Sequence, residues 1–444
     1  MHQALVEKIK GVVGSQHTLT GVELSPYVLE GRTPEVAVFP ASAEEVSELV
    51  ALASEAELPV IPWGGGTKIE IGGAPTRPGL VLGLKRLNRL VEHEPADLTA
   101  TVEAGITLEA LQGLLAKWGQ WLSLDPPFGN RATVGGVLAT NASGPRRHLY
   151  GTSRDLLIGV TVVTADGSVI RGGGRVVKNV AGYDLPKLYI GSFGSLGLVV
   201  EATFKLRPLP DDDRLLVARF DRLKDCGLAV KNLLASDLIP SAVELLDAEA
   251  LRGTALAQDA SESVALLAGF DGLPEQVSWQ CEEARRLFSM CGLVEHRILV
   301  GAAREEGWRA VRELPWLVMG EPAARMKLAV LPTQVAEVVE QLGGVAQMHG
   351  LRAAVSAHAG VGIIIAVLGA GGDSITSVVT TLRAWRELIR GMGGHALLEW
   401  APLVVKEAVA AWDPPGPAFR IMERIKAQLD PKGLLNPGRF VGGI

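Results

Sequence analysis

The stretch Pro62-Trp63-Gly64-Gly65-Gly66-Thr67-Lys68 is the part of this sequence that decides its fold. It begins at the end of an apolar run, residues 58–62, which predicts a short buried strand, so the glycines lie on the turn that leaves the strand. Residues without a Cβ let several backbone N–H groups converge on one anion. Since each such bond to a charged oxygen contributes about 1.5 to 3 kcal/mol, the turn is predicted to hold a pyrophosphate. Taken alone, the same residues also fit an ordinary tight turn.

A second glycine-rich stretch, residues 133–144, reads Thr-Val-Gly-Gly-Val-Leu-Ala-Thr-Asn-Ala-Ser-Gly. Its first glycines, Gly135 and Gly136, would let the backbone approach a planar ring closely. Its polar end, from Asn141 onward, offers groups to ribityl or phosphate oxygens. Together the two stretches predict a flavin site.

Two other nucleotide signatures are missing from the sequence. No G-x-G-x-x-G occurs, and Gly191, Gly194 and Gly197 have the wrong spacing for one, which argues against a nicotinamide enzyme. No G-x-x-x-x-G-K occurs either, which argues against a P-loop nucleotide triphosphatase. FAD is therefore the ligand that best fits both glycine-rich stretches.

Further short motifs follow along the chain, namely Asp125-Pro126-Pro127, Tyr150-Gly151, Ala165-Asp166-Gly167 and residues 191–199 and 429–440. With them, the chain resembles the FAD-linked oxidoreductases of the vanillyl-alcohol-oxidase type, whose flavin domain is of the p-cresol methylhydroxylase type. More narrowly, residues 176–185 and the C-terminal segment resemble the E-subunit family of bacterial glycolate oxidase. The similarity spans nearly the whole chain and is strongest at residues 62–210 and from residue 430 to the end.

The resemblance implies an α+β fold with a two-lobed FAD-binding domain. That domain, of the p-cresol methylhydroxylase type, is expected over residues 1–210. An α+β cap domain that carries the substrate pocket is expected over residues 211–412. A C-terminal segment, residues 413–444, is expected to pack back on the FAD-binding domain.

The pattern of elements agrees with a boundary near residue 210. The run Arg207-Pro208-Leu209-Pro210-Asp211-Asp212-Asp213 is predicted to break any regular element. Before it, Ser42 is predicted to cap a helix and residues 165–167 to form a hairpin turn. Beyond it, alternating segments predict a mostly antiparallel sheet with helices on one face. Strands are expected at 215–220, 264–270, 327–331, 353–358 and 363–368, and helices at 223–234, 274–290, 333–349 and 374–391.

Composition argues against several classes of protein. A formal net charge of −6 over 444 residues gives no electrostatic reason to expect nucleic acid as a partner. The first residues contain no apolar signal core, and we expect no transmembrane segment and a cytoplasmic location, at the inner membrane only through partners. Cys226, Cys281 and Cys291 form no CxxC pair, and three thiols are too few for an ordinary iron-sulfur cluster.

The resemblance carries a set of cofactor-binding residues over to this chain. Family members that bind flavin covalently use a His, Cys or Tyr near the pyrophosphate turn or in the cap, and residues 63–68 contain none, so noncovalent FAD is expected. Val199 would offer its backbone to the adenine, and Asn436 would reach the flavin from the C-terminal tail, although it also fits a turn that ends the last helix. The expected FAD-binding residues are Trp63, Gly64, Gly65, Gly66, Thr67, Lys68, Pro126, Thr133, Gly135, Gly136, Asn141, Ala142, Ser143, Gly144, Val199 and Asn436.

Catalytic residues are harder to assign. Oxidation of a 2-hydroxy acid needs a base for the hydroxyl proton and a cation for the carboxylate. The catalytic branch of the resembled family has a His-Ala-Gly-Asp-Gly-Asn-x-His stretch that supplies two histidines to a metal, whereas this chain has His358-Ala359-Gly360-Val361-Gly362-Ile363-Ile364-Ile365. No metal site is therefore expected. His358, Arg325 and Lys327 are weak catalytic candidates, and each also fits a structural role.

The resemblance implies an FAD-dependent oxidoreductase that acts on CH–OH donors. The expected function is that of the FAD-binding subunit of a complex that oxidises a small 2-hydroxy acid, glycolate or D-lactate. Its partners would be a catalytic flavin subunit and an iron-sulfur subunit. Two alternatives stay open: a self-sufficient FAD-dependent 2-hydroxy-acid dehydrogenase, and a non-catalytic assembly subunit.

Overall fold

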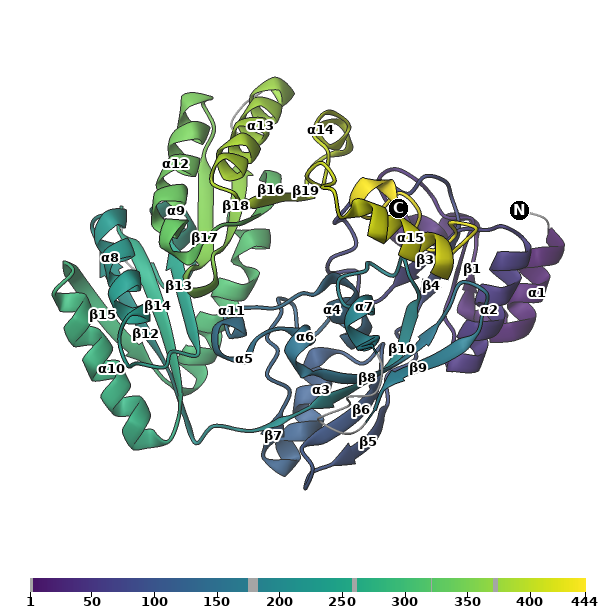
Figure 1. Cartoon of the computed structure of the whole chain (residues 1–444), viewed down its shortest axis with the longest axis horizontal. Helices are drawn as coiled ribbons and strands as arrows, with labels where there is room; N and C mark the ends of the chain where they lie inside the picture. Colours follow the sequence, from purple (N-terminus) through teal and green to yellow (C-terminus); the bar gives the residue numbers. More distant parts are fainter. Residues whose placement is uncertain (1–2, 175–182, 258–261, 321, 370–373) are drawn as a thin grey trace. The chain divides into compact units, whose positions relative to one another are not determined.

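The computed structural model describes residues 3–174, 183–257, 262–320, 322–369 and 374–444, so most of the motif at 176–185 lies outside the described residues. The chain forms two compact units (Figure 1). Unit 1 comprises Met1–Ser143, Gly151–Leu209 and Pro414–Ile444, and unit 2 comprises Gly144–Tyr150 and Pro210–Asp413. As functional domains, the FAD-binding domain, the cap and the returning segment stay predictions.

Unit 1 begins with a four-stranded sheet in the order β1-β2-β4-β3. Its strands are β1 (Thr18–Leu19), β2 (Val36–Val38), β4 (Leu80–Gly83) and β3 (Val60–Trp63). β4 pairs in parallel with both β2 and β3, which requires crossover connections, and α2 (Ala43–Glu55) is one of them. The Ser42 hydroxyl accepts a bond from the Glu45 N–H at 3.2 Å, so the predicted cap is confirmed. α2 packs beside α1 (Gln3–Val13).

The second sheet of unit 1 has five strands in the order β5-β6-β10-β8-β9. These are β5 (Leu90–Glu94), β6 (Thr99–Glu103), β10 (Leu198–Lys205), β8 (Leu157–Val163) and β9 (Val169–Gly173). β8 and β9 pair antiparallel from Val163↔Val169, so the predicted hairpin is confirmed. Short helices α3 (Leu108–Leu115) and α4 (Val134–Thr140) lie between β6 and β8 in the chain.

The boundary predicted at residues 207–213 is only partly a break in structure. Arg207–Pro208 forms β11, which pairs with β7 (Gln120–Trp121), and the first strand of unit 2, β12, already begins at Asp212. The expectation that the run breaks every regular element is therefore wrong. Proline is compatible with such a short pairing at the rim of a sheet, because a strand there has one unpaired side.

Unit 2 is built on one antiparallel sheet of eight strands. Every predicted strand is present, although β16 begins earlier than expected, and three strands were not predicted: β13, β15 and β19. The order is β15 (Leu293–Leu299), β12 (Asp212–Phe220), β14 (Val264–Gly272), β13 (Ala242–Leu246), β17 (Ala353–His358), β18 (Ile363–Gly369), β16 (Pro322–Ala329) and β19 (His395–Trp400).

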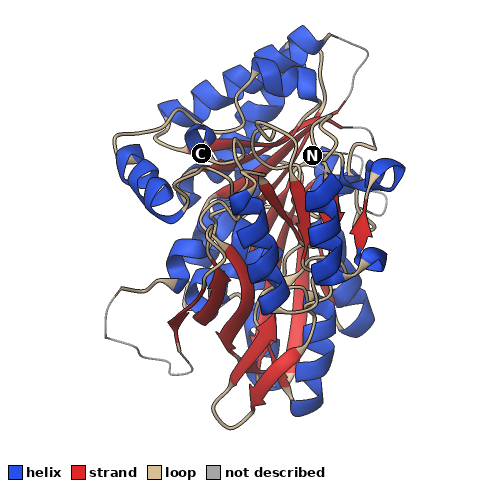
Figure 2. Cartoon of the chain, turned by 90° about the vertical axis from the view of Figure 1, so that its right-hand side faces the viewer, coloured by secondary structure: helices blue, strands red, loops and turns tan. Residues whose placement is uncertain are grey.

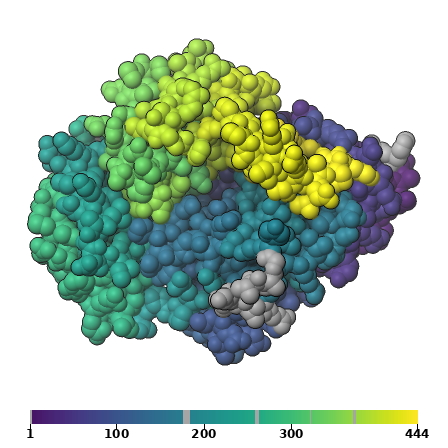
Figure 3. All heavy atoms as spheres, in the orientation of Figure 1, coloured from purple at the N-terminus to yellow at the C-terminus, as the bar shows by residue number. Residues whose placement is uncertain are grey.

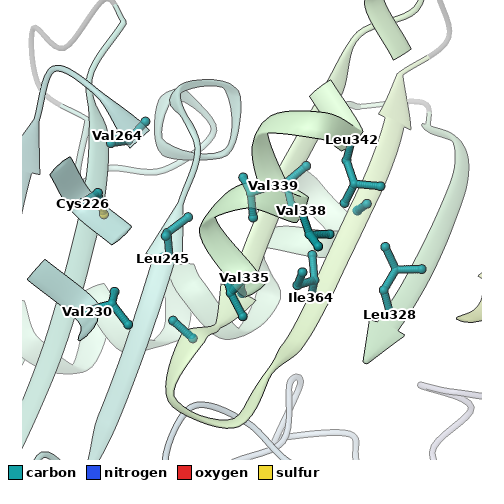
Figure 4. Close-up of a cluster of buried hydrophobic side chains, with 14 of the residues drawn as sticks. Cys226, Val230, Leu245, Val264, Leu328, Val335, Val338, Val339, Leu342 and Ile364 are labelled. Atoms are coloured by element: carbon teal, nitrogen blue, oxygen red, sulfur yellow. The ribbon is translucent and has the colours of Figure 1, made fainter. Parts of the chain in front are cut away.

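Helices cover both faces of this sheet, which corrects the expectation of helices on one face. The first face carries the large core under α8 (Leu223–Leu234), α10 (Pro274–Ser289), α12 (Val335–Met348) and α13 (Ile375–Gly391). Figure 4 shows side chains of α12 such as Val338 and Leu342 packed toward Ile364 and Leu328 of the sheet. The second face carries a smaller core under α9 (Ala248–Arg252) and α11 (Gly301–Leu317). Helices and strands thus both contribute throughout, as an α+β fold requires (Figure 2).

The C-terminal residues, from Pro414, belong to unit 1 and include α15 (Phe419–Leu429). In the space-filling view these residues, drawn in yellow, form part of the surface that faces the reader (Figure 3). Across the described ranges, no helix combines the length and hydropathy that a membrane crossing needs. Cys226, Cys281 and Cys291 are all buried and unpaired with one another.

Candidate functional site

A cavity inside unit 1 collects the two glycine-rich stretches and the C-terminal tail. Its empty volume is about 960 Å³, including space open to solvent. The predicted FAD-binding residues that line it are Trp63, Gly64, Gly65, Gly66, Thr67, Lys68, Pro126, Thr133, Gly135, Gly136, Ala142, Val199 and Asn436.

Three predicted residues are not among the lining of this cavity. Asn141 ends α4 with a left-handed φ of 48°, and Ser143 is the last residue of its segment in unit 1. Gly144 belongs to unit 2. Their role in cofactor binding stays a prediction.

Other lining residues were not predicted from the sequence. Many of them lie beside predicted contacts, above all in residues 189–198, and Arg439 lies in the C-terminal motif. Since 191-Gly-Ser-Phe-Gly-194 is rich in small residues and precedes Val199, its composition was the signal that could have identified it. The additional lining residues are Pro62, Ile69, Leu84, Ala104, Pro127, Ala132, Val137, Ala139, Thr140, Tyr189, Ser192, Phe193, Gly194, Gly197, Leu198 and Arg439.

The turn after β3 presents unused backbone donors to the cavity. Within the described part of the chain, the N–H groups of residues 64–67 donate to no protein acceptor, although all four residues line the cavity. Buried or half-buried N–H groups without acceptors are costly, and a bound anion would satisfy them. The donor set therefore fits the diphosphate of a dinucleotide cofactor.

Two of the glycines also have a packing reason to be glycine. A Cβ on Gly64 would overlap the Thr133 hydroxyl, and a Cβ on Gly65 would overlap the carbonyl oxygen of Arg131. Gly66 has a φ of +73°, which side chains rarely adopt. The turn is thus held against the second glycine-rich stretch before any ligand binds, and substitution of Gly65 would disturb the turn as well as the ligand.

The first turn of α4 offers the cavity an uncovered backbone surface but no free N–H donors. Its first N–H groups are already satisfied, since Val134 donates to the Ile106 carbonyl at 2.9 Å and Gly135 to the Ala104 carbonyl at 2.7 Å. The Gly136 N–H is 3.3 Å from the Thr133 hydroxyl that caps the helix. Gly136 lines the cavity, and a Cβ there would meet nothing closer than that hydroxyl, at 3.1 Å. A flat ring can therefore lie against Gly136 without competing for hydrogen bonds.

The C-terminal tail joins the cavity as an extra strand-like segment. The Val60 N–H donates to the Leu434 carbonyl and the Asn436 N–H to the Val60 carbonyl, both at 2.9 Å. Asn436 is left-handed, with a φ of 48°, and its Nδ2 donates to the Phe193 carbonyl at 2.6 Å. Its buried Oδ1 has no hydrogen-bond partner among the described residues. A buried acceptor without a protein donor, on a residue that lines the cavity, fits a polar ligand group such as the imide N–H of a flavin ring.

A buried lysine fastens this tail to the loop at residues 192–195. The Lys426 ammonium donates to the Asp430 carboxylate at 2.6 Å, to the Ser195 carbonyl at 2.8 Å and to the Leu435 carbonyl at 2.9 Å. Burial lowers the pKa of Lys426, while the bond to Asp430 opposes that shift. All three N–H donors of the ammonium are used, so Lys426 has a structural role: it links the C-terminal tail to the loop at residues 192–195.

A buried arginine fastens the tail to the other side of the cavity. The Arg439 guanidinium donates to the carbonyls of Gly73 and Ile71, each at 2.8 Å, and also to the Ile69 carbonyl. Burial lowers the pKa of Arg439 to about 10, which leaves it charged at neutral pH. Because Ile69 follows the glycine turn directly, Arg439 holds the chain that leaves the turn.

The catalytic candidates lie in unit 2. Arg325 donates to the Glu399 carboxylate at 3.2 Å, both side chains being only 4% exposed, and its guanidinium stacks on the Trp316 ring at 4.3 Å. These contacts are typical of a structural role, and a catalytic role for Arg325 stays a prediction. His358 is hydrogen-bonded to Glu244, and Lys327 lies on the same strand as Arg325. In the part of the chain that the structure describes, no group of three His, Cys, Asp or Glu side chains could hold a metal ion.

Comparison with protein families identifies two matching domains. A model described as "FAD binding domain" matches residues 34–173. A model described as "FAD linked oxidases, C-terminal domain" matches residues 209–440. The two matches follow one another along the chain and cover most of it.

Several relatives resemble the chain over nearly its whole length. Glycolate oxidase subunit GlcD of Bacillus subtilis (strain 168) is 30% identical over 421 residues, which are 92% of this chain and 89% of that protein. D-lactate dehydrogenase of Archaeoglobus fulgidus is 29% identical over 91% of this chain and 91% of its own length. The mitochondrial D-lactate dehydrogenase [cytochrome] of Arabidopsis thaliana is 29% identical over 92% of this chain and 73% of its own length.

Solved structures share the fold. p-Cresol methylhydroxylase with substrate bound superimposes with a TM-score of 0.77 at 19% identity and covers 98% of this chain. Alkyldihydroxyacetonephosphate synthase superimposes with a TM-score of 0.76 at 18% identity. The predicted fold class and the predicted family resemblance are confirmed. The relatives named above are a D subunit and two D-lactate dehydrogenases. Their names do not support the narrower likeness to the E subunit.

Proposed function

Because this chain belongs to the family of FAD linked oxidases and is an FAD-dependent oxidoreductase, we propose that it binds FAD in the cavity of unit 1 and takes part in oxidising a small 2-hydroxy acid. The observation that supports this most strongly is the row of unused N–H groups at residues 64–67, on the wall of the cavity in unit 1. FAD, when bound, supplies a two-electron acceptor for hydride. The chain's own residues hold it and shield it from water.

We assign the diphosphate to the turn at residues 64–67 and the flavin ring to the surface of Gly135 and Gly136. Asn436 would accept a hydrogen bond from the ring through Oδ1, and Val199 would lie at the adenine end. The hydrogen bonds of the buried Lys426 and Arg439 would hold the C-terminal tail over the cofactor. This assignment uses groups that the protein itself leaves unsatisfied.

We further propose that the chain works as a subunit of a glycolate or D-lactate oxidising complex. The names of its relatives, a glycolate oxidase subunit and D-lactate dehydrogenases, support a 2-hydroxy acid as substrate. The E-subunit role is supported by the sequence at 358–365, where aliphatic residues replace the polar groups of the catalytic branch. Its partners would then be a catalytic flavin subunit and an iron-sulfur subunit in the cytoplasm, which pass electrons toward the inner membrane.

A self-sufficient FAD-dependent 2-hydroxy-acid dehydrogenase is the second candidate. It is favoured by the D-lactate dehydrogenases, which match this chain over more than nine-tenths of its length. A non-catalytic assembly subunit is the third candidate, and it would bind FAD without reduction by substrate or would only retain the fold. Anaerobic flavin bleaching of the isolated chain by glycolate or D-lactate separates the self-sufficient dehydrogenase, which should bleach without partners, from both subunit roles.

We predict that the cofactor is not covalently attached. Among the lining residues there is no His or Cys, and the tyrosine, Tyr189, is 3% exposed with a pKa raised by burial, which makes it a poor nucleophile. Acid precipitation of the purified protein should therefore release all yellow colour into the supernatant. Flavin that stays on the denatured chain, and that disappears in Tyr189→Phe, would contradict this prediction and identify the anchor.

A further inference from the structure

One edge of the unit 2 sheet has no neighbouring strand. β15 is the outermost strand of that sheet and pairs only with β12, from Leu215↔Leu299 to Phe220↔Leu293 (Figure 1). Among the described residues, no backbone group of β15 bonds to a loop or helix on its other side. An edge strand presents a row of unpaired N–H and C=O groups, which can pair with a strand of another chain.

The opposite edge of the same sheet is covered. The Leu398 N–H of β19 donates to the Ala411 carbonyl at 2.8 Å, and the Ala396 N–H donates to the Asp413 carboxylate at 2.8 Å. The segment that follows β19 thus supplies partners for that edge. Since β15 has no such cover within the described ranges, it is the edge of this sheet that is open to pairing.

The sequence of β15 is complementary to itself when two copies run in opposite directions. An antiparallel pair of these strands, centred on His296, places Glu295 opposite Arg297 twice. Further from the centre, each apolar residue faces another apolar residue, Val294 opposite Ile298 and Leu293 opposite Leu299. The strand reads Leu293-Val294-Glu295-His296-Arg297-Ile298-Leu299.

The charged pair lies on the second face of the sheet. Glu295 and Arg297 are the register partners of Arg219 and Val217 on β12, and Val217 belongs to the smaller core. The Glu295 carboxylate is 3.0 Å from the Arg219 guanidinium, yet the Glu295 side chain is still 43% exposed. Arg297 donates one N–H to the Leu256 carbonyl at 2.6 Å, and a guanidinium has five. Both side chains therefore keep capacity for an ion pair with a second copy.

Exposed apolar side chains lie at both ends of the same edge. Val294 is 53% exposed, and Met290 and Val300, just before and just after β15, are 61% and 54% exposed. Apolar side chains that gather at one place on a surface mark a binding site, whereas scattered ones need no explanation. In an antiparallel pair the start of one strand lies beside the end of the other, so these side chains would lie near one another across the interface.

We propose that β15 pairs with β15 of a second copy of this chain, antiparallel and centred on His296, so that the two unit 2 sheets become one. The two-fold axis passes between the two His296 residues, perpendicular to the sheet, and both copies use the same surface. Every second facing pair of an antiparallel ladder exchanges two backbone bonds, so seven facing pairs form about six to eight bonds. The oppositely charged pairs Glu295–Arg297 stabilise this register against others.

The mass of the protein in solution tests the pairing. Sedimentation equilibrium of the purified chain should give twice the chain mass of 46.9 kDa. Glu295→Arg places arginine opposite arginine and Arg297→Glu places glutamate opposite glutamate, so each should weaken self-association about tenfold or more. The double variant restores both opposite-charge pairs and should recover the dimer. Since the bond to Arg219 stays lost in it, this recovery reports the contact between the copies.

The register is tested with one cysteine on the proposed axis. His296→Cys brings two thiols face to face, where facing Cα atoms are about 4.5 to 5.5 Å apart, and mild oxidation or a short bis-maleimide should link the two chains. Val300→Cys is the matched control, because it is also exposed but its two copies would lie eight residues apart along the ladder, about 27 Å. The three native cysteines are buried and should not compete.

Three results would overturn the proposal. The first is the mass of a single chain for the unchanged protein at concentrations up to about 100 µM. The second is a dimer that persists in both single charge variants, or links through Val300→Cys as fast as through His296→Cys, which would place the interface elsewhere. The third is a mass that rises only after a partner flavoprotein is added, which would assign this edge to that protein.

Discussion

Replacement of Gly136 by leucine should remove FAD from the chain and leave the chain folded. A Cβ at Gly136 meets only the Thr133 hydroxyl, at 3.1 Å, which must shift slightly, and the rest of the side chain is expected to extend into the cavity that Gly136 lines. Leucine is also a better helix former than glycine by up to about 1 kcal/mol, which supports α4. Loss of the flat contact surface should weaken FAD binding by about 3 kcal/mol, roughly a hundredfold.

The measurement is fluorescence titration of the apoprotein with FAD, together with its thermal unfolding. Gly113→Leu is the matched control, because Gly113 is an exposed glycine in α3 with no atom within 4 Å of its Cβ position. It should bind FAD normally. Normal FAD affinity in Gly136→Leu would place the flavin ring elsewhere. Gly65 is a poorer choice for this test, because any Cβ there collides with the Arg131 backbone.

Removal of the Lys426 ammonium should have the largest effect on stability. Lys426→Met leaves the Ser195 and Leu435 carbonyls and the Asp430 carboxylate without their donor, and Asp430 is 2% exposed. Breaking a buried ion pair on one side costs about 3 to 5 kcal/mol. Since the same tail lines the cavity through Asn436, FAD affinity should fall together with stability.

Chemical denaturation with and without FAD measures both effects. Lys432→Met is the control, because its ammonium makes an exposed bond to the Ser54 carbonyl and should contribute less than about 1 kcal/mol. If the denaturation midpoint of Lys426→Met is unchanged, the hydrogen bonds of Lys426 do not hold the tail. If it loses stability but keeps full FAD affinity, the tail is not part of the cofactor site.

The glycine-rich turn could be predicted from the sequence because its determinants are local. A buried strand followed by residues without Cβ fixes both the position of the turn and its exposed N–H groups, and the structure shows them at residues 64–67. The hydrogen bonds that hold the C-terminal tail could not be predicted in the same way. Lys426 and Ser195 are 231 residues apart, and the acceptor is a backbone carbonyl, which has no sequence signature.

In unit 2, too, contacts between residues far apart in the sequence could not be predicted. His358 on an apolar strand fits a core histidine until the structure shows its partner, Glu244, 114 residues away. β13, which carries Glu244, was not predicted as a strand at all, because an acidic residue interrupts its apolar run. The helices on the second face were likewise missed, since α11 carries many charged residues and only a narrow buried stripe. Pairing across the sheet, not periodicity along the sequence, brings Glu244 and His358 together.

The central claim, that this chain oxidises a 2-hydroxy acid only as part of an assembly, is tested by one comparison. Dye reduction with glycolate and with D-lactate is measured anaerobically for the isolated FAD-loaded chain and for the assembly co-expressed with a partner flavoprotein and an iron-sulfur protein. We expect rapid turnover by the assembly and a rate at least about a hundredfold lower for the isolated chain, because aliphatic residues at 361, 363 and 365 replace the polar groups of the catalytic branch. Rapid turnover by the isolated chain would contradict the subunit assignment and establish a self-sufficient dehydrogenase.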